Sequence, residues 1–220
     1  SAPQRCFFRL ALVSDRAAVI QSTQYIEHIF YIPSLINPGG IAFVRRVGYA
    51  GCMNTLSFPL PNQLLLVVAP HAARQSTLQL AARLAARGPL TVLDGGNQFN
   101  AYPVARAIRR LTPDLSEALA RIRLSRAFTC YQLAALLAET LPGGAPVLAL
   151  DFLATFYDQD VKLPEASRLL AVCIRDLQRL CRSAPVIATA RPPSAACAER
   201  QPLLDTLRAA ASEVWEMPAE

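Results

Sequence analysis

The sequence predicts an α/β protein: a mostly parallel sheet with helices on both faces, preceded by a small N-terminal appendage. From residue 64 onward, apolar runs of about five residues alternate with helical patterns of about ten to eighteen residues. The runs are almost entirely apolar, as is typical of strands that are buried on both faces of a parallel sheet. Their alternation with helices predicts parallel pairing through right-handed crossovers.

Local sequence patterns predict the bounds of the individual strands and helices. Strands are expected at 64–68, 90–94, 121–126, 146–151, 185–190 and 213–217, and helices at 74–87, 103–111, 130–141, 164–182 and 203–211. Thr129 is expected to cap the helix that follows it, and Asp114 a further short helix. Pro103 and Pro164 stand in first turns, where proline is permitted. Residues 191–202 are expected to form a loop.

The region before the regular pattern is assigned separately. Residues 1–58 form the predicted N-terminal appendage, and residues 59–220 form the predicted core. The sequence Pro38-Gly39-Gly40 marks a boundary within the appendage, because proline and glycine interrupt regular structure.

Composition limits the class of protein. Hydrophobic residues make up 53% of the 220 residues and charged residues 17%, which predicts a globular chain with little disorder. No apolar run reaches about 18 residues, so no membrane-spanning segment is expected. The six cysteines include no C-x-x-C pair and the chain has two histidines, which argues against a zinc site. Reduced thiols and an intracellular location, in the cytoplasm or nucleus, are expected.

The chain is basic, with a formal net charge of +6. Lys162 is the only lysine, so arginine supplies nearly all of the positive charge. An arginine surplus suits contact with phosphates, because the guanidinium group binds anions through two parallel hydrogen bonds. The alternative is a bias of genome composition, since alanine and proline are also abundant.

A degenerate phosphate-binding loop follows the first predicted strand, in the sequence VVAPHAARQST. A loop of the form G-x-x-x-x-G-K-[ST] binds phosphate through backbone N–H groups, which its glycines allow to approach closely. Ala69 and Arg74 take the two glycine positions here, and Gln75 takes the lysine position. Only Ser76 and Thr77 keep the expected residue types.

Three blocks in order carry a resemblance to a known family. They are VVAPHAARQSTLQLAARLA, then RIRLSRAFTCYQLAALLAE (121–139), then the run from VLALDFLATFYDQD to APVIATARPP (147–193). This order resembles the core of the RecA/RadA-type strand-exchange recombinases and their paralogues, from about residue 60 to residue 217. The resemblance implies a RecA-like fold of the P-loop NTPase type.

The same resemblance implies that hydrolysis is lost. The family carries a glutamate after its second strand as the general base and a polar γ-phosphate sensor after a later strand. Gly96 takes the first position, and Ala190 and Arg191 the second. Asp151 matches the Walker B aspartate. Without the base, the lysine and the glycines, the chain is expected to be a pseudo-ATPase and not an enzyme.

A vestigial nucleotide site remains in this interpretation. Its residues are Arg74, Gln75, Ser76, Thr77 and Asp151, of which Ser76 and Asp151 form a vestigial magnesium pair. No cofactor is expected, but weak binding of ATP with Mg²⁺ stays open because Arg74 could stand in for the lysine. The ordinary alternative is that Ser76 and Thr77 satisfy free N–H groups at the start of a helix and that Asp151 is a strand-end acid.

The resemblance also implies an accessory or scaffold role in DNA recombination or repair. The expected partner is another recombinase paralogue or a recombinase, and single-stranded DNA is a candidate ligand. The candidate DNA contacts are Arg191, Arg200, Arg121, Arg123 and Arg126, with Arg45, Arg46, Arg109 and Arg110 as further candidates. Each of these could instead be a solvated surface arginine. The letters of Phe8-Arg9-Leu10-Ala11 match the short F-x-x-A motif with which recombinases dock on a neighbouring subunit.

Two other functions stay open at this point. One is a divergent ATPase with a non-standard phosphate loop, in which Arg74 replaces the lysine. The other is a RecA-fold scaffold that binds proteins and not DNA. The missing base at Gly96 argues against the first, and the sequence does not separate the second from the accessory role.

Overall fold

The computed structural model describes residues 44–47 and 63–217. The chain divides into two units, Ser1–Ile32 and Pro33–Glu220, of which the second contains all the described residues. The motif at 8–11 lies outside the described residues, as do the side chains of Arg45 and Arg46.

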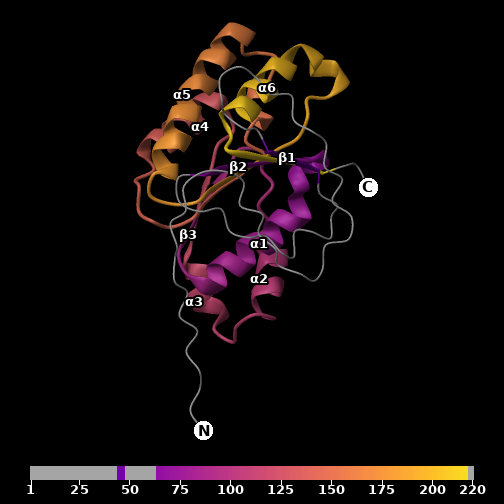
Figure 1. Cartoon of the computed structure of the whole chain (residues 1–220). Helices are drawn as coiled ribbons and strands as arrows, with labels where there is room; N and C mark the ends of the chain where they lie inside the picture. Colours follow the sequence, from indigo (N-terminus) through magenta and orange to yellow (C-terminus); the bar gives the residue numbers. More distant parts are fainter. Residues whose placement is uncertain (1–43, 48–62, 218–220) are drawn as a thin grey trace, which may run out of the picture. The chain divides into compact units, whose positions relative to one another are not determined.

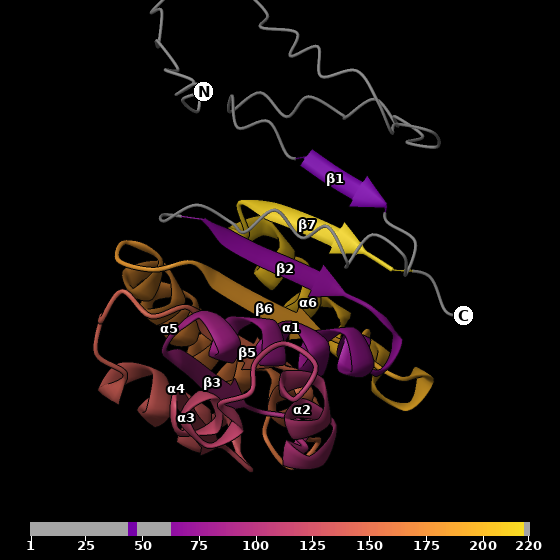
Figure 2. The same ribbon diagram turned by 90° about the horizontal axis from the view of Figure 1, so that it is seen from below.

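The described residues contain one seven-stranded sheet in which every neighbouring pair of strands is parallel. The strands are β1 (Val44–Val47), β2 (Leu64–Val68), β3 (Leu90–Asp94), β4 (Ile122–Arg126), β5 (Val147–Leu150), β6 (Val186–Ala190) and β7 (Glu213–Glu216). Their order is β1-β7-β2-β6-β5-β3-β4, and Figure 2 shows β1, β7, β2 and β6 side by side. The predicted α/β class and parallel sheet are therefore confirmed. Strand β1 falls within the predicted appendage 1–58, yet it extends this sheet.

Helices cover both faces of the sheet. They are α1 (Arg74–Arg87), α2 (Ala101–Ile108), α3 (Leu115–Ala120), α4 (Cys130–Glu139), α5 (Leu163–Cys181) and α6 (Gln201–Ala210). Figure 1 shows α4, α5 and α6 on one side and α1, α2 and α3 on the other. Each layer packs on its own apolar cluster, because alternate residues of a strand point to opposite faces. Leu64 and Leu66 face the first cluster, whereas Leu65 and Val67 face the second.

Local hydrogen bonds decide where the helices begin. They explain which of the predicted helix starts are right and which are not. Thr129 Oγ1 accepts a hydrogen bond from the Gln132 N–H at 3.2 Å, so the predicted cap of α4 is confirmed. Helix α2 begins two residues before Pro103, because Asn100 Oδ1 accepts from the Tyr102 N–H at 3.0 Å. Asp114 takes the predicted N-cap position of α3, but its side chain makes no capping hydrogen bond to that helix.

The predicted loop at 191–202 is also wrong in its second half. Residues Ala195–Arg200 form the 3-10 helix η4, and α6 begins directly after it at Gln201. Pro202 stands in the first turn of α6, where its missing N–H leaves no hydrogen bond unmade. The segment that contains Pro202 therefore starts a helix instead of ending a loop.

The described cysteines form no disulfide with one another. They are Cys130, Cys173, Cys181 and Cys197. Burial raises the pKa of the Cys173 thiol to about 12 and that of Cys181 to about 11. Within 44–47 and 63–217, no helix has the length and apolar character needed to cross a membrane.

Candidate functional site

The carboxyl ends of β3, β5 and β6 bring three buried polar side chains to one edge of the sheet. They are Asp94, Asp151 and Thr189, each at most 2% exposed. Asp94 holds the turn after β3, because its two carboxylate oxygens accept from the N–H groups of Gln98 and Phe99 at 2.8 and 2.9 Å. Thr189 Oγ1 accepts from the Asp151 N–H at 2.9 Å. Parallel α/β sheets bind their ligands at this edge.

Each buried carboxylate at this edge is neutralised by an arginine. Arg126 Nε lies 3.3 Å from Asp94 Oδ2, and Arg191 Nε lies 3.4 Å from Asp151 Oδ2. The Asp151 Oδ1 atom is buried and has no hydrogen-bond partner among the described residues. Loss of solvent raises the pKa of Asp151, and the charge of Arg191 opposes that rise. Asp151 is thus a buried carboxylate that contacts other groups of the protein and not solvent.

Gly96, the position expected to lack the general base, lies directly against Asp151. A Cβ atom at residue 96 would come within 3.0 Å of both the Cβ and the Oδ2 atom of Asp151. No residue with a side chain fits there without movement of the Asp151 backbone or side chain. The position of Asp151 therefore leaves no space for a glutamate side chain at residue 96.

The degenerate phosphate loop turns from β2 to α1 through a strained segment. His71, Ala72 and Ala73 all have φ between 50° and 52°, in the left-handed region that favours glycine. Helix α1 starts without a side-chain cap, at an Ala73 that is itself left-handed. Thr77 does not satisfy a free N–H group, contrary to the ordinary interpretation from sequence: its Oγ1 donates to the Ala73 carbonyl at 2.8 Å.

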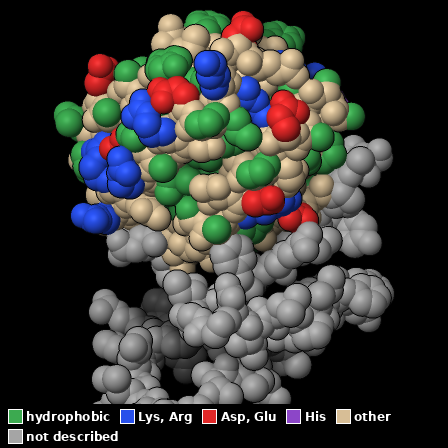
Figure 3. Space-filling view, turned by 90° about the horizontal axis from the view of Figure 1, so that it is seen from above, with side chains coloured by type: hydrophobic (Ala, Val, Ile, Leu, Met, Phe, Trp, Pro, Cys, Tyr) green, Lys and Arg blue, Asp and Glu red, His purple; other side chains and the backbone are tan. Residues whose placement is uncertain are grey.

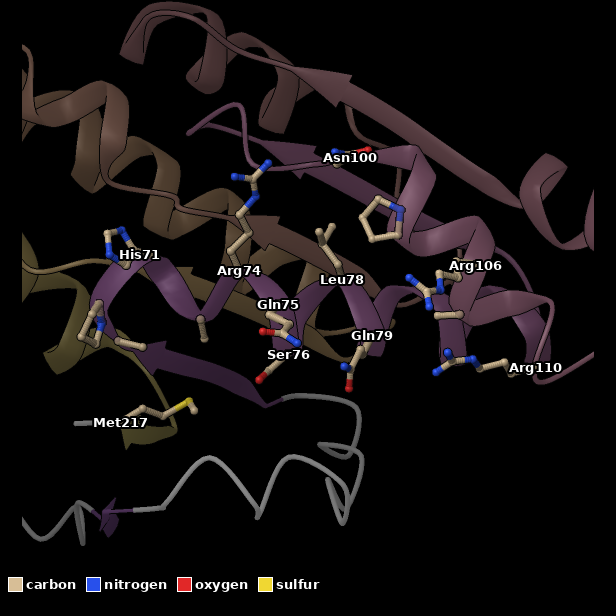
Figure 4. Close-up of a pocket in the computed structure, with 15 residues that line it drawn as sticks. His71, Arg74, Gln75, Ser76, Leu78, Gln79, Asn100, Arg106, Arg110 and Met217 are labelled. Carbon is tan, nitrogen blue, oxygen red and sulfur yellow. The ribbon is translucent and has the colours of Figure 1, made fainter. Parts of the chain in front are cut away.

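The residues at the start of α1 point in two directions. Arg74 extends toward Asn100, whereas Gln75 and Ser76 lie on the side of Met217 (Figure 4). Arg74 Nε donates to the Gln98 carbonyl at 3.2 Å, so the arginine is tied to the turn after β3. All of these except Gln98 line a cavity of about 850 Å³ between α1, α2 and the end of β7.

No contact is seen between Ser76 and Asp151, the two residues of the predicted magnesium pair. Ser76 lines the cavity beside α1, whereas Asp151 is fully buried and is not among the residues that line it. No hydrogen bond joins the two residues, and Asp151 Oδ2 instead faces Arg191 and the Gln98 amide, 3.4 Å away. In the described part of the chain, no group of three or more metal-ligating side chains gathers. The residues present do not fit Mg²⁺-ATP held as in the recombinases.

Arg200 is not available as a DNA contact, which corrects the expectation from sequence. Its side chain is about 4% exposed. It donates to the Phe156 carbonyl at 2.8 Å and to the Val161 carbonyl at 2.5 Å. Arg200 therefore holds the segment after β5, and its burial keeps its guanidinium out of reach of a phosphate in solution.

The other candidate arginines differ in how firmly they are held. Arg191 and Arg126 pair with the two buried carboxylates, and Arg121 pairs with Glu117 on α3. These three remain partly exposed, so a phosphate would compete with an existing partner. Arg123 is exposed on the edge strand β4 and makes no ion pair with a described residue.

The sequence interpretation misses two residues of α2, of which Arg106 lines the cavity and Tyr102 directly precedes the lining residue Pro103. Arg106 is not among its candidates, and its predicted helix begins at Pro103, which leaves Tyr102 outside. The structure places Tyr102, Arg106 and Arg110 four residues apart, a spacing that puts them on one side of the helix. That spacing is readable from the sequence once the start of α2 is known.

Neither a protein-family model nor a curated protein sequence matches the chain. The resemblance to the recombinases therefore depends on the three sequence blocks. The structure adds an all-parallel α/β sheet, an architecture shared by Rossmann-type and P-loop-type proteins.

Proposed function

We propose that the protein is a RecA-like recombinase paralogue that does not hydrolyse ATP and acts as an intracellular accessory or scaffold protein in DNA recombination or repair. Single-stranded DNA is its candidate ligand, and a recombinase or another paralogue is its candidate partner. The observation that carries the loss of catalysis is the confinement of Asp151. This aspartate, at the Walker B position, is buried against Gly96 and paired with Arg191.

The chemistry of phosphoryl transfer supports this proposal. Such enzymes work mainly by positioning phosphates and by stabilising negative charge with a lysine and a metal ion. Gln75 at the lysine position is uncharged, and Asp151 is paired with Arg191 while Ser76 lines a separate cavity. Residue 96, at the position of the base, has no room for a carboxylate side chain.

A scaffold that binds proteins and not DNA is the second candidate, and one observation favours it. Strand β4 pairs with β3 and ends the described sheet, so its other edge is open. Beside that edge, Phe128 is 69% exposed and Tyr131 is 51% exposed. Exposed aromatic side chains next to an unpaired strand are features of protein-docking surfaces.

The test of catalysis compares ATP turnover by the purified full chain and by Asp151→Ala, with circular dichroism to show that both are folded. We expect the wild type to show no turnover above that of the variant. Turnover that Asp151→Ala removes would instead support the divergent ATPase. In that case Arg74→Ala should remove it as well, because Arg74 would supply the missing positive charge.

The test of partnership is recovery of the tagged native protein with its bound proteins, identified by mass spectrometry. Enrichment of a recombinase or a recombinase paralogue is expected. A Phe128→Ala/Tyr131→Ala variant serves as the comparison, because it changes the exposed aromatic pair without touching the core. Recovery of only proteins unrelated to DNA would contradict the proposed role.

A further inference from the structure

We propose that the groove between α1 and α2 binds the phosphate backbone of a single-stranded nucleic acid, with Arg106 and Arg110 on phosphates and Tyr102 stacked on a base. The inference depends on the proposed association with DNA and assigns it to a site that contains Arg110, a further candidate from sequence, but none of the five main candidate arginines. The groove is the cavity of about 850 Å³ described above.

The three side chains form a stripe along α2. Tyr102, Arg106 and Arg110 follow one another at intervals of four residues, the last in the turn that ends the helix. At 3.6 residues per turn, they fall within about a quarter of the helix circumference. Val104 and Ile108 are the buried residues of α2, so the stripe lies away from the core.

Both arginines of the stripe lack a partner in the described part of the chain. The side chains of Arg106 and Arg110 are exposed and make no ion pair or hydrogen bond with a described residue. Two like charges four residues apart destabilise a helix slightly, and an anion bound between them would reverse that effect. The described residues that line the groove include no aspartate or glutamate.

Two arginines of α5, on the other face of the sheet, provide a contrast because they form ion pairs. On α5, Arg168 pairs with Glu165 at 2.7 Å and Arg179 with Asp176 at 3.0 Å. The surface seen in Figure 3 carries basic and acidic side chains interspersed. The lining of the groove thus differs in charge from these stretches of α5, where two arginines pair with acids of the same helix.

The opposite wall supplies neutral hydrogen-bonding groups. Arg106 and Arg110 point toward Gln79 on α1, and Arg74 lies farther along the groove beside Asn100 (Figure 4). The positive charges are thus spread along the groove and do not converge on one point. Such a distribution suits a chain of phosphates better than a single phosphate group.

Tyr102 adds the second component of single-strand recognition. Its side chain is 75% exposed, one helical turn before Arg106. Proteins that bind single strands without sequence preference combine a basic groove with aromatic side chains on which bases stack. Tyr102 does not line the groove itself, but it directly precedes the lining residue Pro103, so an exposed aromatic side chain adjoins the basic groove.

The experiment measures binding of the full chain to fluorescent dT20 and rU20 by anisotropy over a series of salt concentrations. The main variant is Arg106→Ala/Arg110→Ala. The matched control is Arg175→Ala/Arg182→Ala, which removes the same charge from the face of the sheet covered by α5. Tyr102→Ala and Tyr102→Phe test stacking separately, and thermal melts establish that all variants are folded.

We expect the groove variant to bind more weakly and to flatten the salt dependence of log K by about 0.7 for each phosphate that is no longer neutralised. Tyr102→Ala should weaken binding by about fivefold or more while leaving the salt slope unchanged, and Tyr102→Phe should bind as the wild type does. Comparison of dT20 with rU20 identifies which nucleic acid the groove prefers, and weaker binding of either by the groove variant supports the site.

Three results would overturn the inference. They are equal loss of affinity in the control variant, absence of binding by the wild type at low salt, and inorganic triphosphate that competes as strongly as the oligonucleotide per phosphate. Absence of binding by the wild type would also remove single-stranded DNA as the candidate ligand of the proposed function. The other two results leave the proposed scaffold role untouched, because that role depends on ATP turnover and on the recovered partners. Conversely, ATP turnover or unrelated partners would overturn that role and leave groove binding measurable.

Discussion

Gly96 and Asp151 lie so close together that a Cβ atom at residue 96 would overlap the Asp151 side chain. Gly96→Ala should therefore lower the free energy of unfolding by about 1–3 kcal/mol, the usual cost of overfilling a packed site. The measurement is chemical denaturation of both proteins. A glutamate at residue 96 should cost more, and it should not create ATP turnover.

A double-mutant cycle checks that the overlap is the cause. Asp151→Gly removes the atoms that residue 96 would meet, and glycine suits the φ of +44° at residue 151. The cost of Gly96→Ala should fall in the Asp151→Gly background by about 0.5–3 kcal/mol, as is usual for coupled neighbours. Equal costs in both backgrounds would show that the strain at residue 96 has another origin.

The buried Asp151 carboxyl predicts a dependence of stability on pH. Its pKa is higher in the folded state than the ordinary value of 3.8, chiefly because burial disfavours the charged form. A raised folded pKa gives stability that is complete below pH 3.8 and is lost as pH rises through the folded value. Asp151→Asn, which resembles the protonated form, should lack this loss.

Comparing the wild type with Asp151→Asn removes the contributions that other titratable groups make to the pH dependence of stability. The stability of the wild type relative to the variant should decrease as pH rises from about 3.8, the unfolded value, so that at neutral pH the variant is at least as stable. A relative stability that increases with pH would mean that the ion pair with Arg191 outweighs the cost of burial.

Replacement of a left-handed residue in the degenerate loop should stabilise the protein. His71 is exposed and has a φ of 52°, which costs about 1 kcal/mol for a residue with a side chain. His71→Gly should raise the free energy of unfolding by about 1 kcal/mol and the melting temperature by about 2–4 °C. His71→Ala keeps the strain and is the control; an equal gain there would exclude the backbone explanation.

The periodicity of apolar residues predicted most of the fold, whereas contacts between side chains could not be predicted from the sequence. The strands at 64–68 and 90–94 have the same bounds in the structure, because continuous apolar runs between turn residues specify buried strands. The sequence could place Asp151 at a strand end, but it could not show that Arg191 would neutralise it. It likewise could not separate Arg106, which has no described partner, from Arg200, which is buried. These differences depend on contacts between residues far apart in the chain.

Arg200 provides the last prediction, because the structure assigns it to stability and not to DNA. Its guanidinium donates to the carbonyls of Phe156 and Val161, which belong to the segment between β5 and α5. Arg200→Ala should lower the free energy of unfolding by about 3 kcal/mol, since two carbonyls lose their donors in a buried place. Arg200→Lys should recover little, because one ammonium group cannot reproduce the two donors of the planar guanidinium. At temperatures where the variant is folded, its affinity and salt slope for dT20 should equal those of the wild type. A flattened salt slope in a folded Arg200→Ala protein would return this residue to the DNA contacts.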